Sequence, residues 1–406
     1  MDDLTLASKP DHVSLDLVRD LDPWVEIMAA GADGHARAAR FHTEYPPIFW
    51  ATRLGYFGGC WVPRRAEDLR RILQDPETFT SQGLTGFSQL IGEAWPLIPL
   101  EVDPPQHSLY RILLNPLFTP KKVAELGAEM QALASDLILA VVDKGGCDFN
   151  AAFATRFPVL IFLKLMGWPL DEAPKFVAWT RTLVKSSDMA LVAGVCGEIA
   201  GYLRGRIAER RLNPTDDFTS YVLGCEIEGR KLTEDEVLGV CFLIFIGGLD
   251  TVTSALGFQF HHLARHPEHQ AQLREKPELI LAAVEELLRA YSIVNMRRMV
   301  TKDVRVGDVL MRKGDHVLIS TELADLDPEE FTDPTQVDFE RQDNRHMAFS
   351  YGPHRCLGSH LARRELAIAL QEWLTRVPPF RLRDEQRIEM RASGVFSLEN
   401  LELQWT

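Results

Sequence analysis

Hydrophobic residues recur at helical spacing along much of this chain. Apolar positions fall on one helix face in three segments, residues 121–144, 150–167 and 357–375. Thr233 lies three residues before Glu236, which is typical of a capping box and predicts the start of a long helix that runs to about Ala264. Pro277 suits the first turn of a further helix. The pattern therefore predicts a mainly α-helical protein.

Strand patterns are fewer and shorter. Residues 50–66 carry β-forming side chains on both sides of Gly58-Gly59, which predicts a hairpin. Residues 304–319 alternate between apolar and polar positions around turn signals, and they predict short strands. No linker rich in glycine, serine or proline and no repeat divides the sequence. We therefore expect one domain over residues 1–406, mainly α with a minor β portion.

Composition narrows the range of partners and locations. The chain of 406 residues is 46% hydrophobic and 25% charged, as in ordinary globular proteins. Its 44 basic and 58 acidic residues give a net charge of -14, which argues against nucleic acid as a partner. The longest apolar run, residues 240–249, is too short to span a bilayer, and the N-terminus lacks a signal-peptide pattern. We expect a cytoplasmic protein that binds no membrane.

The six cysteines show no CxxC pair or zinc-type spacing, which suits a reducing compartment. One of them, Cys356, follows Phe349 and Gly352 and precedes Gly358. A cysteine thiolate that ligates a metal needs shielding from water and backbone N–H groups near its sulfur, and glycines let the chain fold around it. The helical pattern from residue 357 also places Cys356 just before a helix N-terminus, which favours the thiolate. The alternative is a buried structural cysteine.

A second motif lies inside the long predicted helix. Gly247 and Gly248 are adjacent there, and each costs about 1 kcal/mol of helix stability relative to alanine. Small residues would let a flat ligand or dioxygen approach the backbone, with the acid of Asp250 and the hydroxyl of Thr251 beside the gap. Close packing against another helix is the alternative explanation of the two glycines.

Together these two motifs resemble the haem-thiolate loop and the oxygen-activating helix of the cytochrome P450 family. The resemblance implies the fold of that family, with haem b (iron protoporphyrin IX) between the long helix and the cysteine loop. It implies that Cys356 is the axial ligand. It also implies that Asp250 and Thr251 are catalytic, delivering protons to dioxygen so that the O–O bond breaks.

Further matches to the family concern charged residues. Glu286 and Arg289 share a helix face at a spacing of three, and the family's pattern adds a later arginine, here Arg341, in a structural role. The haem propionates need cations or other donors. The positions that match the family's propionate partners are Arg111, Arg298, His354 and His107.

The similarity is strongest to the soluble bacterial camphor hydroxylase subfamily, and it weakens over residues 165–223, the expected lid. Where that subfamily has a tyrosine that holds the substrate's ketone, this chain has Trp95, whose indole can donate but not accept a hydrogen bond. A small apolar terpenoid or norisoprenoid, ionone-like rather than camphor, is therefore the expected substrate. The expected lining of its pocket, for which an ordinary core role is the alternative, is Trp95, Leu243, Ile246, Val294, Val395 and Phe396.

Electrons must come from another protein, because the sequence carries no flavin or iron–sulfur motif. The resemblance implies a 2Fe-2S ferredoxin with its NADH-dependent reductase. A basic patch on the cysteine side would attract an acidic ferredoxin. Its candidates are Arg70, Arg71, Arg111, Lys121, Lys122, Arg355, Arg363 and Arg364. The propionate and docking roles proposed for Arg111 compete with each other.

Two other functions fit part of this pattern. One is a haem-based binding or sensing protein without turnover, and the other is a hydroxylase that uses peroxide. Asp250 and Thr251 argue against both, because neither function needs a proton relay to dioxygen.

Overall fold

A computed structural model describes residues 9–55, 57–186, 188–384, 387–392 and 394–406. Its internal contacts define two compact units. Unit 1 comprises the chain up to Ser81, Gly257–Cys356 and Pro379–Gln404, and unit 2 comprises Gln82–Leu256, Leu357–Pro378 and Trp405–Thr406. The chain passes between the units several times, so neither is a continuous segment. The single domain expected over residues 1–406 stays a prediction.

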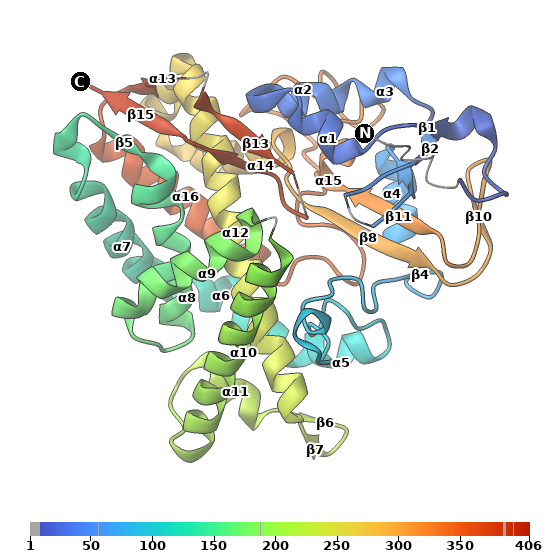
Figure 1. Ribbon diagram of the computed structural model, residues 1–406. Helices are drawn as coiled ribbons and strands as arrows, with labels where there is room; N and C mark the ends of the chain where they lie inside the picture. The colour runs from blue at the N-terminus through green and yellow to red at the C-terminus, as the bar shows by residue number, and fades with distance from the viewer. Residues whose placement is uncertain (1–8, 56, 187, 385–386, 393) are drawn as a thin grey trace. The chain divides into compact units, whose positions relative to one another are not determined.

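Unit 1 is built on a mixed sheet, in which the described residues form six strands in the order β1-β2-β3-β11-β8-β4 (Figure 1). The strands are β1 (Val18–Arg19), β2 (Ile48–Ala51), β3 (Cys60–Pro63), β11 (His316–Ser320), β8 (Asn295–Val300) and β4 (Phe79–Thr80). β2 and β3 are antiparallel, with Trp50 opposite Trp61, which confirms the predicted pairing, although the first strand ends at Ala51 rather than at Gly58-Gly59. Side chains of Trp50, Trp61 and Val317 join the apolar core of this unit.

The remaining elements of unit 1 are short helices and short strands. The helices are α1 (Pro23–Met28), α2 (Gly34–Ala39), α3 (Phe41–Glu44), α4 (Ala66–Leu73), α13 (Pro267–Glu275), α14 (Ile280–Ala290) and α15 (Thr321–Asp325). The further strands are β9 (Val304–Val306), β10 (Val309–Met311), β12 (Phe380–Leu382), β13 (Glu389–Arg391) and β14 (Ser397–Glu399). Strands β9, β10 and β11 confirm the short strands expected over residues 304–319. The helix expected from Pro277 begins with a 3₁₀ turn and continues as α14.

Unit 2 is helical around a large apolar core. Its helices are α5 (Gln106–Leu114), α6 (Pro120–Glu125), α7 (Gly127–Leu139), α8 (Arg156–Leu165), α9 (Ala173–Lys185), α10 (Met189–Leu212), α11 (Phe218–Gly224) and α16 (Ser359–Arg376). Its short strands are β5 (Gly146–Asp148), β6 (Glu226–Ile227) and β7 (Arg230–Lys231). The last strand, β15 (Glu402–Trp405), belongs to unit 1 up to Gln404. The helix predicted over residues 121–144 is interrupted at Leu126, and the one over 150–167 starts as a π-helix at Asn150–Ala154.

The long predicted helix is α12 (Glu234–Arg265), drawn in yellow-green to yellow in Figure 1. Its capping box is confirmed, because Thr233 N donates to Glu236 Oε2 at 2.6 Å and Glu236 N donates to Thr233 Oγ1 at 3.2 Å. Tyr110 Oη also donates to Glu236, at 2.6 Å, which ties α5 to the start of α12. Hydrogen bonds from Arg230 then lower the pKa of Glu236 to about 2, so this carboxylate stays charged.

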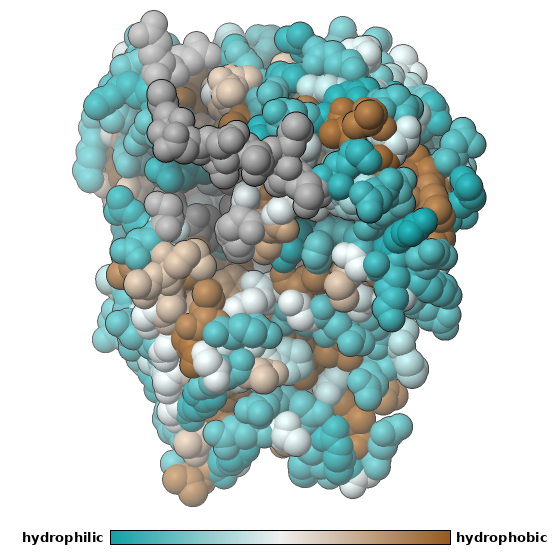
Figure 2. Space-filling view, turned by 45° about the vertical axis from the view of Figure 1, so that its right-hand side comes forward, coloured by the Kyte–Doolittle hydropathy of each residue, from teal (hydrophilic) through white to brown (hydrophobic). Residues whose placement is uncertain are grey.

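Within the described residues, α12 alone contains an 18-residue window that is apolar enough to cross a membrane. However, 56% of that window is buried inside the protein, as in the core helix of a globular fold. The apolar run of residues 240–249 is shorter than this helix, because polar residues further along it, such as Ser254 and Gln259, are also buried. On the face shown in Figure 2, hydrophobic residues form separate patches among hydrophilic ones.

Candidate active site

Cys356 lies in a tight loop of unit 1. Its backbone N–H donates to Phe349 O at 2.9 Å, and Arg355 N donates to Gly352 O at 3.1 Å. Gly352 has a φ of 69°, and a Cβ there would lie 2.3 Å from Leu73 O at the end of α4. Only glycine therefore fits this turn of the loop. As expected, α16 follows at once, starting at Ser359.

Exposure separates Cys356 from the other cysteines. Of the six, Cys356 is the exposed one, with Cys147 half-buried and the remaining four buried. Burial raises the pKa of the Cys196 thiol to about 11 and that of Cys241 to about 12, so both stay protonated. The buried-structural alternative therefore does not apply to Cys356, which is accessible to a ligand.

Two of the predicted propionate partners are in the same unit as Cys356. Arg298 lies on β8 and is 3% exposed, with Nη1 donating to Arg297 O at 2.8 Å. His354 belongs to the cysteine loop, and its Nε2 is 3.4 Å from Ser81 Oγ, directly after β4. Since β4 pairs with β8, the sheet brings His354 and Arg298 to the same part of unit 1. A buried guanidinium is stabilised by an anion, and a carboxylate suits it best.

Unit 2 holds the other two predicted partners. His107 and Arg111 are four residues apart on α5, so they share one helix face. His107 is 2% exposed. Arg111 is half-buried, and its Nε donates to Asn115 Oδ1 at 3.0 Å.

The glycine pair of α12 faces open space. A Cβ built at Gly247 or Gly248 meets no atom within 4 Å, which excludes close helix packing as the reason for these glycines. By contrast, a Cβ at Gly239 would lie 2.1 Å from Pro96 O, so that glycine is the one required by packing. No local pattern in the sequence distinguishes Gly239 from the pair further along the helix.

Thr251 is held by the helix beside this open space. Its Oγ1 donates to Gly247 O at 2.7 Å, one turn earlier. The proton of the hydroxyl is thus engaged, and its oxygen keeps lone pairs that can accept a hydrogen bond. Asp250 is half-buried next to it on the same helix. An acid and an oriented hydroxyl can together hold and pass a proton.

Trp95 occupies the core of unit 2. It is 3% exposed, and its ring lies 4.9 Å from that of Phe242 on α12, between centroids. Its indole N–H donates to Glu93, whose carboxylate also accepts two hydrogen bonds from Arg204 on α10, at 2.6 and 3.0 Å. These bonds lower the pKa of Glu93, the Arg204 bond most of all. The donor of Trp95 is therefore already used within the protein.

The other expected pocket residues fall into two groups. Leu243 and Ile246 are half-buried on α12 and pack against the same core cluster as Trp95. In unit 1, Val294 and Val395 are opposite each other in an antiparallel bridge, and both are half-buried. Phe396 is fully buried, and its ring packs edge-on against His35 in the core of unit 1.

Glu101 is a residue that the sequence interpretation missed. It is 6% exposed, and its carboxylate accepts hydrogen bonds from Thr85 N, Thr85 Oγ1 and Leu97 N at 2.7 to 2.9 Å. One side chain thereby organises the loop that carries Trp95. No local motif marks such a residue, because its partners lie on an irregular segment.

The predicted ion pairs of Glu286 are confirmed. Arg289 makes two bonds to its carboxylate, at 2.8 and 2.9 Å, and Arg341 Nε binds it at 3.0 Å. Asp338 N and Asn344 Nδ2 donate to the same carboxylate at 3.1 Å. Both Glu286 and Arg289 are essentially inaccessible to water. The segment that leads to the cysteine loop is thus fixed to α14.

We predict that Glu286→Gln destabilises the protein by about 3–5 kcal/mol, because it leaves the buried Arg289 without a compensating charge. The matched control is Glu285→Gln, since the Glu285 carboxylate is 32% exposed and pairs with His346. That pair should contribute less than about 1 kcal/mol. Urea unfolding of both variants measures the difference, and equal midpoints would contradict the structural role of Glu286.

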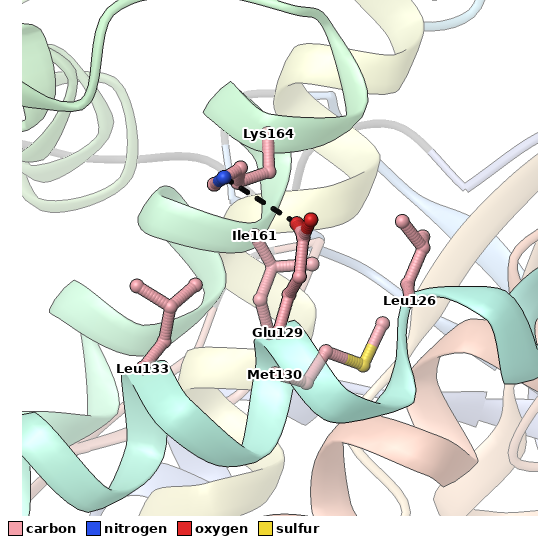
Figure 3. Close-up of a pocket in the computed structure, with 6 residues that line it drawn as sticks. All are labelled: Leu126, Glu129, Met130, Leu133, Ile161 and Lys164. Carbon is pink, nitrogen blue, oxygen red and sulfur yellow. Dashed lines mark ion pairs between the residues drawn. The ribbon is translucent and has the colours of Figure 1, made fainter.

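A small depression lies between α7 and α8 (Figure 3). Leu126, Met130 and Ile161 line it, and Lys164 pairs across it with Glu129 at 3.4 Å. Its volume of about 10 Å³ holds no more than about one water molecule. It is therefore no substrate site.

The predicted basic patch is partly neutralised. Arg70 makes a bidentate pair with Glu330, at 2.7 and 2.8 Å, and Lys122 pairs with Glu125 at 2.9 Å. Arg71 donates to a backbone carbonyl, as does Arg363. Charges that already have acidic partners attract a docking protein less strongly.

These residues fit an iron porphyrin. Cys356 offers an accessible sulfur in a loop closed by backbone hydrogen bonds, and Arg298 and His354 offer donors for carboxylates in the same unit. In unit 2, the open side of Gly247 and Gly248 leaves room for a flat ligand beside Thr251.

Comparisons with known proteins support this assignment. The family described as Cytochrome P450 matches residues 176–405. "Probable cytochrome P450 127A1" of Sinorhizobium fredii is 42% identical over 403 residues, covering 98% of this chain and 96% of the relative. "Steroid C26-monooxygenase" of Mycobacterium tuberculosis is 31% identical, covering 82% and 91%. The crystal structure of CYP101J2 superposes with a TM-score of 0.89 at 32% identity, covering 98% of this chain and 100% of that one.

Proposed function

The chain belongs to the cytochrome P450 family, and from this premise we propose that it inserts one oxygen atom into a small apolar terpenoid or norisoprenoid, ionone-like rather than camphor. Members of the family are haem monooxygenases, and this chain is an enzyme of that class with haem b as its cofactor. The narrower choice of substrate rests on Trp95. Because its indole N–H is bonded to Glu93, Trp95 presents an apolar ring rather than a donor.

The catalytic roles follow from the positions of this chain's own groups. When bound, haem supplies the iron at which dioxygen is activated, and a cysteine thiolate donates electron density to that iron. We assign the thiolate to Cys356. Thr251, whose proton is engaged by Gly247 O, would accept a hydrogen bond from a water molecule and so hold a proton in position. Asp250 replenishes that proton from the solvent side. Arg298, His354, Arg111 and His107 are the proposed partners of the propionates.

The names of relatives at similar identity point to different compounds. "Steroid C26-monooxygenase" is 31% identical to this chain, and "Nocardicin C N-oxygenase" of Nocardia uniformis is 33% identical. Identity in this range does not transfer a substrate. The apolar surroundings of Trp95, Leu243 and Ile246 are what support an apolar compound.

A panel of ligands tests the substrate class. Ionones, camphor, a fatty acid and a steroid are titrated into the ferric protein, and the Soret shift is followed as water leaves the iron. We expect ionones to give the tightest binding and the largest shift, with hydroxylated product on turnover. Tighter binding and faster turnover of the fatty acid or the steroid would refute the proposal.

Trp95→Tyr is predicted to shift preference toward camphor. The smaller ring frees volume, and the phenol can donate to a ketone, a bond worth about 0.5–1.5 kcal/mol or up to about tenfold in affinity. Elongated ionones lose the broad aromatic surface and should bind less well. Spin-state titrations of both ligands with both proteins measure the ratio of affinities. An unchanged ratio would exclude Trp95 from the substrate pocket.

We further propose a 2Fe-2S ferredoxin, reduced by an NADH-dependent reductase, as the electron donor. The basic candidates of unit 2 support it, namely Arg111, Lys121, Arg363 and Arg364 on α5, α6 and α16. An acidic ferredoxin would be steered to them by charge. A cytoplasmic location is part of the same proposal, since the enzyme would have to share a compartment with the ferredoxin and its reductase.

Arg111→Ala should slow reduction by ferredoxin severalfold and flatten its dependence on salt. Loss of one steering charge acts mainly on the association rate. Arg111→Lys keeps the charge and should retain most of the rate, while haem content measured in both variants separates docking from propionate binding. Stopped-flow measurement of the reduction of each variant by ferredoxin, at several ionic strengths, gives the slope of the rate against salt. Kinetics equal to the parent's would place the docking site elsewhere.

A further inference from the structure

Histidine side chains gather where α12 ends and α13 begins in unit 1. Among them, His262, His266 and His269 form a group of neighbouring rings, with Glu268 beside them, and these four residues are called the histidine cluster below. The rings of His262 and His266 are 4.3 Å apart and inclined by 23°, and those of His262 and His269 are 5.0 Å apart and inclined by 25°. The cluster has no part in the oxygen chemistry proposed above.

The geometry points to a binding site for a divalent transition-metal ion, with Zn²⁺ as the best fit, at His266, Glu268 and His269. One ligand atom from each of these residues lies within 4.8 Å of the others. Zinc takes imidazole nitrogen and carboxylate oxygen at about 2.0–2.2 Å, so its ligand atoms stand about 3.3 Å apart in a tetrahedron. Small side-chain rotations would bring the ligand atoms from within 4.8 Å of one another to this tetrahedral spacing.

Hydrogen bonds already orient one ligand. His262 Nε2 lies 2.7 Å from His269 Nδ1, and His262 Nδ1 lies 2.7 Å from Tyr291 Oη. If His269 Nδ1 donates to His262, and His262 Nδ1 donates to Tyr291, then the lone pair of His269 is on Nε2, which is free to bind a cation. Metal-binding histidines characteristically donate their other N–H to a partner in this way. The ring of Phe339, 4.7 Å from His269, restricts its rotation further.

The remaining ligands are accessible. His266 and His269 are half-buried, while Glu268 is exposed. Glu268 Oε1 accepts a hydrogen bond from His266 Nδ1 at 2.9 Å, which leaves its second oxygen for the ion. Three protein ligands leave a fourth position to water. Such an ion would clamp the first turn of α13 to the end of α12, and we infer a stabilising rather than a catalytic role.

Equilibrium dialysis of the untagged holoenzyme against Zn²⁺ at pH 7.5 tests the site, because unperturbed imidazoles are neutral at that pH. We expect one tightly bound Zn²⁺ per haem. His266→Gln and His269→Gln should each abolish it, and His262→Phe should weaken it by about 10–100-fold, as loss of an orienting partner does. His360→Gln, which removes an exposed histidine of α16, is the matched control and should bind as the parent does.

Thermal unfolding with and without Zn²⁺ gives a second readout, since an ion bound to the folded state alone raises Tm. The shift should disappear in His266→Gln and His269→Gln, and circular dichroism without metal confirms that these variants fold. A parent protein that binds no Zn²⁺, or cluster variants that bind it as the parent does, would overturn the site. An equal loss of Zn²⁺ binding in His360→Gln would show that the ion binds diffusely to surface histidines. That result would also overturn the proposed site.

Discussion

Cys356→Ser is expected to remove the red-shifted Soret band of the ferrous carbonyl complex and to reduce turnover to background. A serine hydroxyl stays protonated and cannot donate electron density as a thiolate does. The loop itself should survive, because its bonds run between backbone atoms, Cys356 N to Phe349 O and Arg355 N to Gly352 O. Carbon monoxide difference spectra and product assays measure both effects.

The control for this substitution is Cys147→Ser. Cys147 is a half-buried cysteine on β5, so its loss tests whether removal of any accessible cysteine disturbs the spectrum. We expect that variant to keep the parent's band. If Cys356→Ser also keeps the band and normal turnover, then Cys356 is not the haem ligand.

Thr251→Ala is expected to leave haem and substrate binding nearly unchanged while product formed per NADH falls. Reducing equivalents should appear as hydrogen peroxide, because no hydroxyl holds the proton at the reacting oxygen. Positioned proton donors contribute about 10²–10⁴-fold, so a fall in coupling on the order of tenfold or more is expected. The measurement compares NADH consumed, product formed and peroxide released in the same reaction.

Thr253→Ala is a closely matched control for Thr251. Thr253 is on the same helix, but its Oγ1 donates to Leu249 O at 2.8 Å and to Ala154 O at 3.1 Å, inside unit 2. Its removal should affect stability and leave the coupling of NADH to product intact. Coupling that is unchanged in Thr251→Ala, or equally reduced in both variants, would contradict the role of Thr251.

Features encoded by local spacing could be predicted from the sequence. The capping box at Thr233, the pair of Glu286 with Arg289 and the loop around Cys356 each depend on residues a few positions apart. The family resemblance supplied Arg341, which is 55 positions from Glu286. Local pattern and family motif together therefore predicted the helix-rich fold and the centre of the site.

Features that depend on distant contacts could not be predicted. Glu93 meets Arg204 across 111 positions, and nothing in either segment marks the pairing.

The role of Gly58 and Gly59 was also ambiguous in the sequence. Gly58-Gly59 suggested a tight turn, yet β2 and β3 are joined by residues 52–59, and a Cβ at Gly59 would lie 2.7 Å from the ring of Trp50. That glycine is needed for packing, which sequence spacing alone does not reveal.

The carboxylate of Glu286 also constrains the order in which the chain folds. Its contact with Arg289 closes within one helical turn and forms early at little entropic cost. Its contacts with Asp338, Arg341 and Asn344 each require a loop of more than fifty residues to close. The segment before Cys356 is therefore set late in folding, after α14 exists to receive it. With Cys356 as the proposed haem ligand, we expect cofactor capture by that loop to follow the closure of these contacts.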